Sequence, residues 1–146
     1  MRYRYTEFPN ALDPNLPFPR PMIGGRVVNG NKTKGLPAVV DSGCDVTLAH
    51  PDIGTLIGFD VPTGRPYNYT GSVVGSAAPA YIHTVHLIIV NHSWVDLDIA
   101  FSDEMPEGFI LLGQRGFFDS FDIKFCLSRE FFEVIELPRP ASRALH

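Results

Sequence analysis

The chain has 146 residues, of which 45% are hydrophobic and 19% are charged, and its formal net charge is −4. This length is typical of a single domain, and the hydrophobic share excludes a chain that is disordered by composition. The acidic balance does not favour a nucleic-acid partner, because phosphates require a basic face. The longest apolar run, residues 87–90, is too short to span a bilayer, so we expect no membrane partner.

Cysteine and histidine spacing predicts neither a disulfide framework nor a metal site. Cys44 and Cys126 are too few for the first and lack the spacing of the second. His83 and His86 are three apart on an expected strand, so they point to opposite faces and do not share a metal. We therefore predict no cofactor. The N-terminal residues lack the continuous apolar core of a signal peptide, which predicts a cytoplasmic protein.

Glycine and proline, thirteen of each, divide the chain into short apolar runs, a pattern typical of an all-β domain. Residues 1–22 are proline-rich, and we expect them to form an extended arm outside the core. Asn29-Gly30-Asn31 is a strong turn signal between two expected strands. Strands are predicted at residues 22–28, 36–40, 81–90, 94–101, 109–112, 123–127 and 131–137.

Helical structure is expected to be sparse. Pro51 suits the first turn of a short helix, and Gly58 is a suitable stop. Residues 117–121 are predicted to form a single helical turn. A segment rich in glycine, serine and alanine, residues 71–80, separates two strand-like runs. Many short strands with little helix predict a closed barrel or a sandwich.

The chain carries one Asp-Ser-Gly sequence at the end of an apolar strand, in Val39-Val40-Asp41-Ser42-Gly43. The strand would bury its apolar side chains and present the carboxylate at its open end. The hydroxyl can lock the loop, and the glycine permits a sharp turn and a close approach of substrate. Asp-Ser-Gly is also ordinary turn chemistry, so the tripeptide alone favours a simple turn.

A second apolar run changes this interpretation. About seventy residues later, Phe109-Ile110-Leu111-Leu112-Gly113 ends in glycine and is followed by Phe117-Phe118. The sequence here resembles the retropepsin-like aspartic proteases, which pair an apolar-apolar-Asp-Ser/Thr-Gly motif with a later apolar-apolar-Gly motif and a short helix. The resemblance covers residues 20–137, and residues 112–121 look especially like the prokaryotic single-domain members.

The resemblance implies roles for individual residues. The fold would be a small closed barrel with one or two short helices, comprising an arm (1–22), a protease domain (23–137) and a tail (138–146). The catalytic residue would be Asp41. Ser42 and Gly43 would support the active-site loop, Leu112 and Gly113 would pack against it, and substrate would contact Asp45 and a glycine-rich flap at Val74, Gly75 and Ser76.

Hydrolysis of a peptide bond by carboxyl groups needs two of them facing each other. The pair shares one proton, so that one group acts as base and the other as acid. The chain has one Asp-Ser/Thr-Gly sequence, so the resemblance implies a homodimer with one Asp41 from each subunit. A peptide or protein substrate would lie in the cleft as an added strand beneath the flaps. The implied function is that of an aspartic endopeptidase.

Three departures from the family pattern leave alternatives open. Cys44 replaces the usual alanine, and Ser76-Ala77-Ala78-Pro79 makes the flap less rich in glycine. Gln114 stands where retroviral members usually carry an arginine, which pairs with an aspartate at the place of Asp45. The alternatives are a catalytically weak or inactive dimer that binds extended peptides, and an unrelated small β-barrel that binds ligands.

Overall fold

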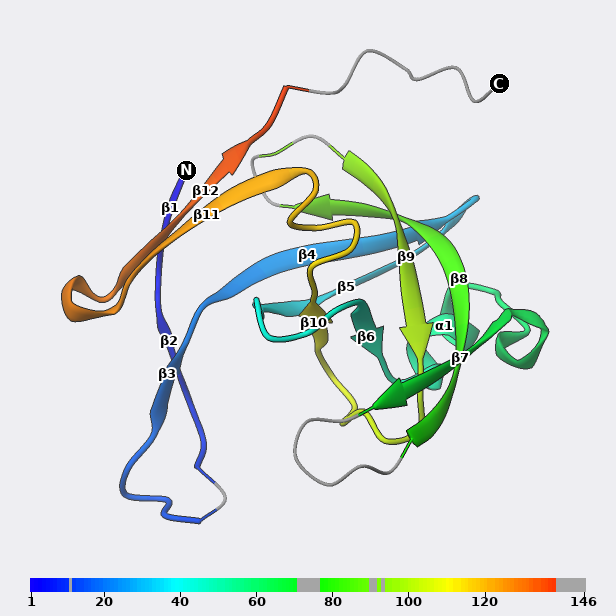
Figure 1. Cartoon of the computed structure of the whole chain (residues 1–146), viewed down its shortest axis with the longest axis horizontal. Coiled ribbons are helices and arrows are strands. Elements are labelled where there is room, and N and C mark those ends of the chain that lie inside the picture. Colours follow the sequence, from blue (N-terminus) through cyan, green and yellow to red (C-terminus); the bar gives the residue numbers. More distant parts are fainter. Residues whose placement is uncertain (11, 71–76, 90–91, 93, 139–146) are drawn as a thin grey trace.

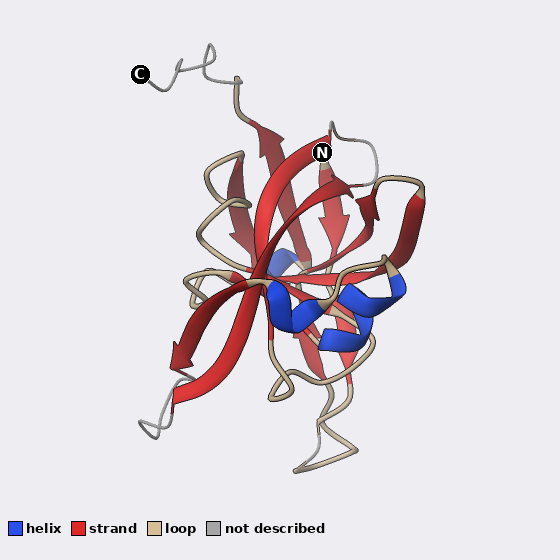
Figure 2. Cartoon of the chain, turned by 90° about the vertical axis from the view of Figure 1, so that its right-hand side faces the viewer, coloured by secondary structure: helices blue, strands red, loops and turns tan. Residues whose placement is uncertain are grey.

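The computed structural model describes residues 1–10, 12–70, 77–89, 92 and 94–138. Within these residues the regular secondary structure is mainly β-strand, with one short α-helix and two 3₁₀ helices (Figures 1 and 2). The prediction of an all-β fold is confirmed. No helix of the described residues has the length and apolar character needed to cross a membrane.

The main sheet has seven strands: β4 (Met22–Asn29), β5 (Lys32–Val40), β6 (Thr47–Ala49), β7 (Arg65–Thr70), β8 (Ala77–Ile89), β9 (Trp94–Phe101) and β10 (Ile110–Leu112). Their order in space is β4-β5-β10-β6-β9-β8-β7, and β8 also pairs with β4. This last pairing closes six strands into a barrel, while β7 continues the sheet beyond β8. The predicted closed barrel is confirmed.

Strand β10 lies between β5 and β6, although it follows them by about sixty residues. It pairs in parallel with β5, which places Leu112 beside Val40, and it pairs antiparallel with β6 through Leu111 and Leu48. Residues 41–46, which connect β5 to β6, therefore pass around the end of β10. This loop contains the Asp-Ser-Gly sequence.

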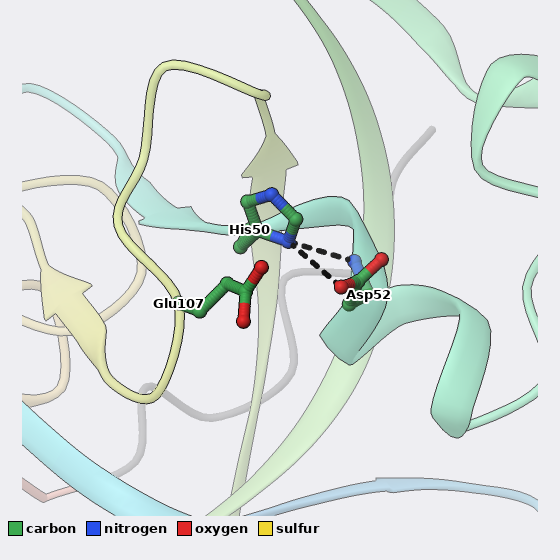
Figure 3. Close-up of side chains that lie close together, drawn as sticks. All are labelled: His50, Asp52 and Glu107. Atoms are coloured by element: carbon green, nitrogen blue, oxygen red, sulfur yellow. Dashed lines mark hydrogen bonds and ion pairs between the residues drawn. The ribbon is translucent and has the colours of Figure 1, made fainter.

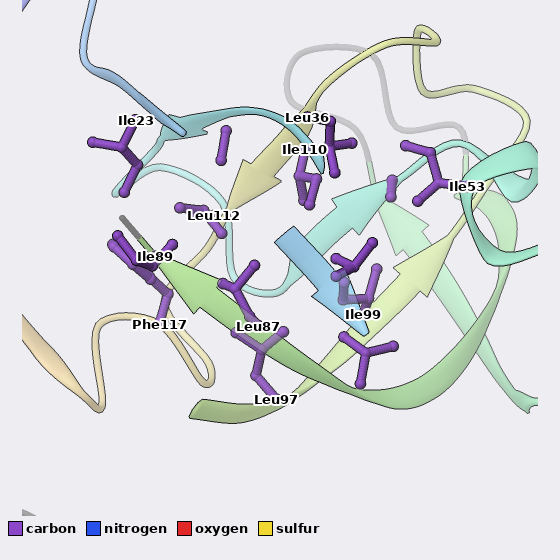
Figure 4. Packing of buried hydrophobic residues seen from close by; sticks show 14 of the residues in the cluster. Ile23, Leu36, Ile53, Leu87, Ile89, Leu97, Ile99, Ile110, Leu112 and Phe117 are labelled. Atoms are coloured by element: carbon purple, nitrogen blue, oxygen red, sulfur yellow. The ribbon is translucent and has the colours of Figure 1, made fainter. Parts of the chain in front are cut away.

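The barrel interior is a close-packed apolar core (Figure 4). Its fully buried side chains include Val27, Leu87, Ile89, Ile99, Ile110, Leu112 and Phe117. Burying one such side chain contributes about 1.5–3 kcal/mol. Because side chains alternate along a strand, Val39 and Leu111 point away from this core, toward the outer surface beside residues 41–46.

The single α-helix, α1 (Pro51–Leu56), begins and ends near the predicted residues. Proline occupies its first turn, and the N–H of Asp52 donates to Nδ1 of His50, the N-cap residue. Gly58 follows the helix with a φ of 92°, a conformation that favours glycine. The predicted helix is confirmed, and a 3₁₀ helix, η1 (Val61–Thr63), follows it.

A second sheet joins the two ends of the chain (Figure 1). It consists of β1 (Arg2–Arg4), β12 (Phe131–Glu136) and β11 (Phe121–Cys126), in that order, and η2 (Leu127–Arg129) links the last two in sequence. Phe132 is fully buried between the rings of Tyr3 and Tyr5, at centroid distances of 5.5 and 5.6 Å. Part of the predicted arm therefore packs against the core, and the domain boundaries stay a prediction.

The rest of the predicted arm forms a two-stranded hairpin, β2 (Thr6–Phe8) and β3 (Phe18–Arg20). It extends away from the barrel (Figure 1). Three-residue strands carry too little periodicity to be recognised in sequence, which is why β1, β2, β3 and β6 were not predicted. β7 corresponds to the strand-like run expected before residue 71, although Pro66 lies within it.

His92 is a buried histidine between the second sheet and the barrel. Its side chain is 7% exposed, and its Nε2 has no hydrogen-bond partner among the described residues. The rings of Tyr3 and Phe121 lie 6.2 and 5.4 Å away. Burial lowers the pKa of His92 below 6.5, the amino group of Met1 acts in the same direction, and Glu136 opposes them.

We predict that stability falls as pH drops below 6.5, because the unfolded chain then binds a proton that the folded His92 resists. The contribution is at most about 1.4 kcal/mol per pH unit. Urea unfolding of the parent and of His92→Phe between pH 7.5 and 5.5 measures it. The variant should show the shallower loss of stability, and parallel curves would contradict the prediction.

Candidate active site

Asp41 stands at the end of β5, where the loop 41–46 leaves the barrel. Its backbone N–H donates to the carbonyl of Leu112 at 3.0 Å, so β10 holds it directly. Its carboxylate Oδ1 accepts from the N–H of Gly43 at 2.9 Å, and its carbonyl accepts from the N–H of Cys44 at 3.2 Å. The carboxylate is thus oriented by its own turn while the residue stays partly exposed.

Gly113 is the point of closest approach between this loop and the end of β10. A Cβ at this position would lie 2.3 Å from the carbonyl oxygen of Val46 and 2.8 Å from that of Cys44. Its N–H donates to the hydroxyl of Thr47, which is fully buried. Only a residue without a side chain fits here, which explains a glycine after the apolar run.

Gln114 and Arg115 continue the attachment of the loop. The N–H of Gln114 donates to the carbonyl of Cys44 at 2.7 Å, and that of Arg115 to the carbonyl of Asp45 at 2.9 Å. The side-chain Nε2 of Gln114 donates to the carbonyl of Ser42 at 2.6 Å. Gln114, whose presence left loop rigidity open in the sequence, therefore braces the active-site loop through both backbone and side chain.

Cys44 is buried within this loop. Its side chain is 8% exposed, and its Sγ donates to the carbonyl of Val46 at 2.9 Å. Burial raises the pKa of the thiol, the hydrogen bond to Val46 opposes this shift, and the nearby carboxylates of Asp41 and Asp45 raise the pKa further. The neutral thiol is a weak nucleophile, so this environment suits a packing residue.

Two cavities meet at Asp41. The first, here called the hairpin cavity, has a volume of about 510 Å³ and includes Phe8, Phe18, Arg20, Val39, Phe109 and Leu111 in its lining. The second, the tyrosine cavity, has a volume of about 180 Å³ and includes Cys44, Asp45, Tyr67, Tyr69 and Leu111. Asp41 lines both, so the carboxylate stands between two spaces of unequal size.

This arrangement brings together some of the predicted site residues. The residues of the loop and those after β10 share one network of backbone hydrogen bonds. Val74, Gly75 and Ser76 lie outside the described residues, although the hairpin that leads to them pairs as far as Thr70 and Ala77. In the part of the chain that the structure describes, no second carboxyl group is hydrogen-bonded to Asp41.

The sequence did not indicate four aromatic residues of the two cavities. Tyr67 and Tyr69 alternate on β7, and this period of two was a usable signal. Phe8 and Phe18 are each followed by proline, but nothing in the sequence places either near Asp41. Their position depends on where the hairpin lies relative to Phe109 and Asp41.

One cluster of potential metal ligands lies at the start of α1 (Figure 3). The ligand atoms of His50, Asp52 and Glu107 are within 4.8 Å of one another. Nδ1 of His50 already accepts the N–H of Asp52, and the acidic residues are exposed. Helix capping accounts for the first two, so we assign no metal to the cluster.

Comparisons with known proteins find similarity among solved structures. No protein-family model matches the chain. No curated protein matches it either. Among solved structures, the chain is similar to EIAV protease complexed with the inhibitor HBY-793, with 19% identity and a TM-score of 0.47 over 65% of this chain and 82% of that one. The candidate site is defined by the strand topology and by the contacts of Asp41, Gly113 and Gln114.

Gly113→Ala is predicted to destabilise the protein by about 1–3 kcal/mol or more, because the new methyl group overlaps backbone atoms that cannot rotate away. Gly35→Ala is the matched control, since the nearest atom to a Cβ there is 3.9 Å away. Its effect should stay within about 0.5 kcal/mol. Equal unfolding midpoints for the two variants in urea would show that Gly113 is not sterically required.

Proposed function

We propose that the chain is an aspartic endopeptidase that hydrolyses peptide bonds with a water activated by paired Asp41 carboxylates of a homodimer. The observation that carries this proposal is the placement of Asp41. It is held at the barrel rim by Leu112 and flanked by a cavity on each side. A fixed, accessible carboxylate between two such spaces suits a reaction at the middle of an extended chain.

The chemistry requires a second carboxyl group opposite the first. Two such groups held close cannot both ionise easily, so the pair retains one proton. The ionised group removes a proton from water as it attacks the carbonyl carbon, and the protonated group donates to the carbonyl oxygen. Later proton transfer to the amine releases the products. A second copy of the chain would supply the missing carboxyl group from the same position.

A peptide in extended conformation fits the two unequal cavities. Its successive side chains point in opposite directions, so neighbouring residues on the same side of the cleaved bond would enter different spaces. Leu111 and Val39 offer apolar walls beside the carboxylate. Gln114 and the altered flap motivate the alternative of an inactive peptide-binding dimer. Of these two, Gln114 contacts Ser42 and Cys44, and these contacts support a rigid loop.

Asp41→Asn is predicted to reduce cleavage of a peptide library at mildly acidic pH by at least about a hundredfold, since it removes the general base. The fold should persist because the Asn oxygen can still accept from Gly43. Asp122→Asn, at an exposed site on β11, is the control and should retain parent activity. Undiminished cleavage by Asp41→Asn would contradict the proposal.

Mixing the two proteins tests the shared site. If activity needs one Asp41 from each subunit, an equal mixture of parent and Asp41→Asn chains retains about a quarter of the parent activity after exchange, not half. Product formation measured after equilibration, at a fixed total concentration, distinguishes the two values. A loss strictly proportional to the parent fraction would indicate that each chain works alone.

A further inference from the structure

We propose that the β2–β3 hairpin is a substrate-recognition element that selects a large apolar side chain, aromatic above all, next to the cleaved bond. This inference rests on the proposed function and assigns a role to Phe8 and Phe18. Both side chains line the hairpin cavity together with Asp41. The hairpin therefore forms a wall of the space beside the candidate catalytic group.

Strand register explains how the hairpin presents this wall. Phe8 pairs with Phe18, and Thr6 pairs with Arg20, so these four residues share one face of the hairpin. Phe8, Phe18 and Arg20 of that face line the cavity. The intervening pair, Glu7 and Pro19, belongs to the opposite face and is exposed. The face that carries Phe8 and Phe18 thus meets the cavity, while the face that carries Glu7 and Pro19 is turned away from it.

The wall is joined to the catalytic region through Phe109. The ring of Phe8 meets that of Phe109 edge to face, at a centroid distance of 5.8 Å and an interplanar angle of 74°. Phe109 directly precedes β10, whose Leu111 lines the same cavity. A side chain bound between the hairpin and β10 would therefore lie beside Asp41.

Exposure on this face indicates the chemistry of the ligand. Phe18 is 42% exposed, and its ring is covered on one side by the guanidinium of Arg20 at 5.3 Å. A two-stranded hairpin is marginally stable by itself in water, so apolar contact with a ligand would stabilise it.

The size of the hairpin cavity also bears on the ligand. Its volume of about 510 Å³ falls within the range of ligand sites and far exceeds the 180 Å³ of the tyrosine cavity. The first space therefore has more room for a large apolar side chain than the second.

The test compares Phe8→Ala and Phe18→Ala with Phe125→Ala, a matched control on β11 that is 41% exposed and outside the cavity. Substrates are peptides that differ only in carrying Phe, Leu or Ala beside the cleaved bond. For the Phe peptide, kcat/KM should fall about tenfold in both hairpin variants, in the range expected for apolar pockets. For the Ala peptide it should change less than about twofold. Phe18→Leu should restore most of the loss.

A binding measurement separates this inference from the proposed function. Dissociation constants of the same peptides are measured by fluorescence anisotropy on Asp41→Asn and on Asp41→Asn combined with Phe18→Ala, after circular dichroism confirms equal folding. Weaker binding of the Phe peptide alone in the double variant supports the hairpin even if no Asp41-dependent cleavage is found. Asp41-dependent cleavage with unchanged peptide preference and binding in all variants would overturn the hairpin inference and leave the endopeptidase proposal standing.

Discussion

The parallel pairing of β10 with β5 is the constraint on which the rest of the site depends. It sets Leu112 beside Val40, so that the next N–H along β5, that of Asp41, donates to the Leu112 carbonyl. Buried backbone groups need partners, and this pairing supplies them in the barrel wall. Because β10 also separates β5 from β6, the connecting loop is forced to turn at the rim, where a carboxylate can meet solvent.

The same pairing directs alternate side chains of β10 to opposite sides of the barrel wall. Ile110 and Leu112 fill the core, while Leu111 between them reaches both cavities at Asp41. Beyond the strand, Gly113 and Gln114 continue the contact and attach the loop by its carbonyl groups. One segment thus supplies core, cavity lining and loop support in succession, and a change in its register would disturb all three together.

The sequence predicts those parts of the molecule that local chemistry determines. Apolar runs separated by glycine and proline identify the longer strands, and Pro51 with Gly58 delimits the helix. Asp41 and Gly113 could be paired only through resemblance, because nothing local states that residues seventy apart are neighbours. The sequence leaves the role of Gln114 open for a related reason: its side chain reaches Ser42 through the tertiary turn, which spacing alone does not reveal.

Symmetry links the proposed chemistry to the proposed specificity. In a two-fold dimer with paired Asp41 residues, each hairpin cavity has a copy on the other side of the carboxyl pair. A bound peptide has direction and no two-fold axis, so its residues on either side of the cleaved bond would meet equivalent aromatic walls from different subunits. One Phe8–Phe109 ring pair from each subunit would then lie beside the bound peptide. Selection for large apolar residues should accordingly extend to both sides of the bond, each side governed by the hairpin of a different chain.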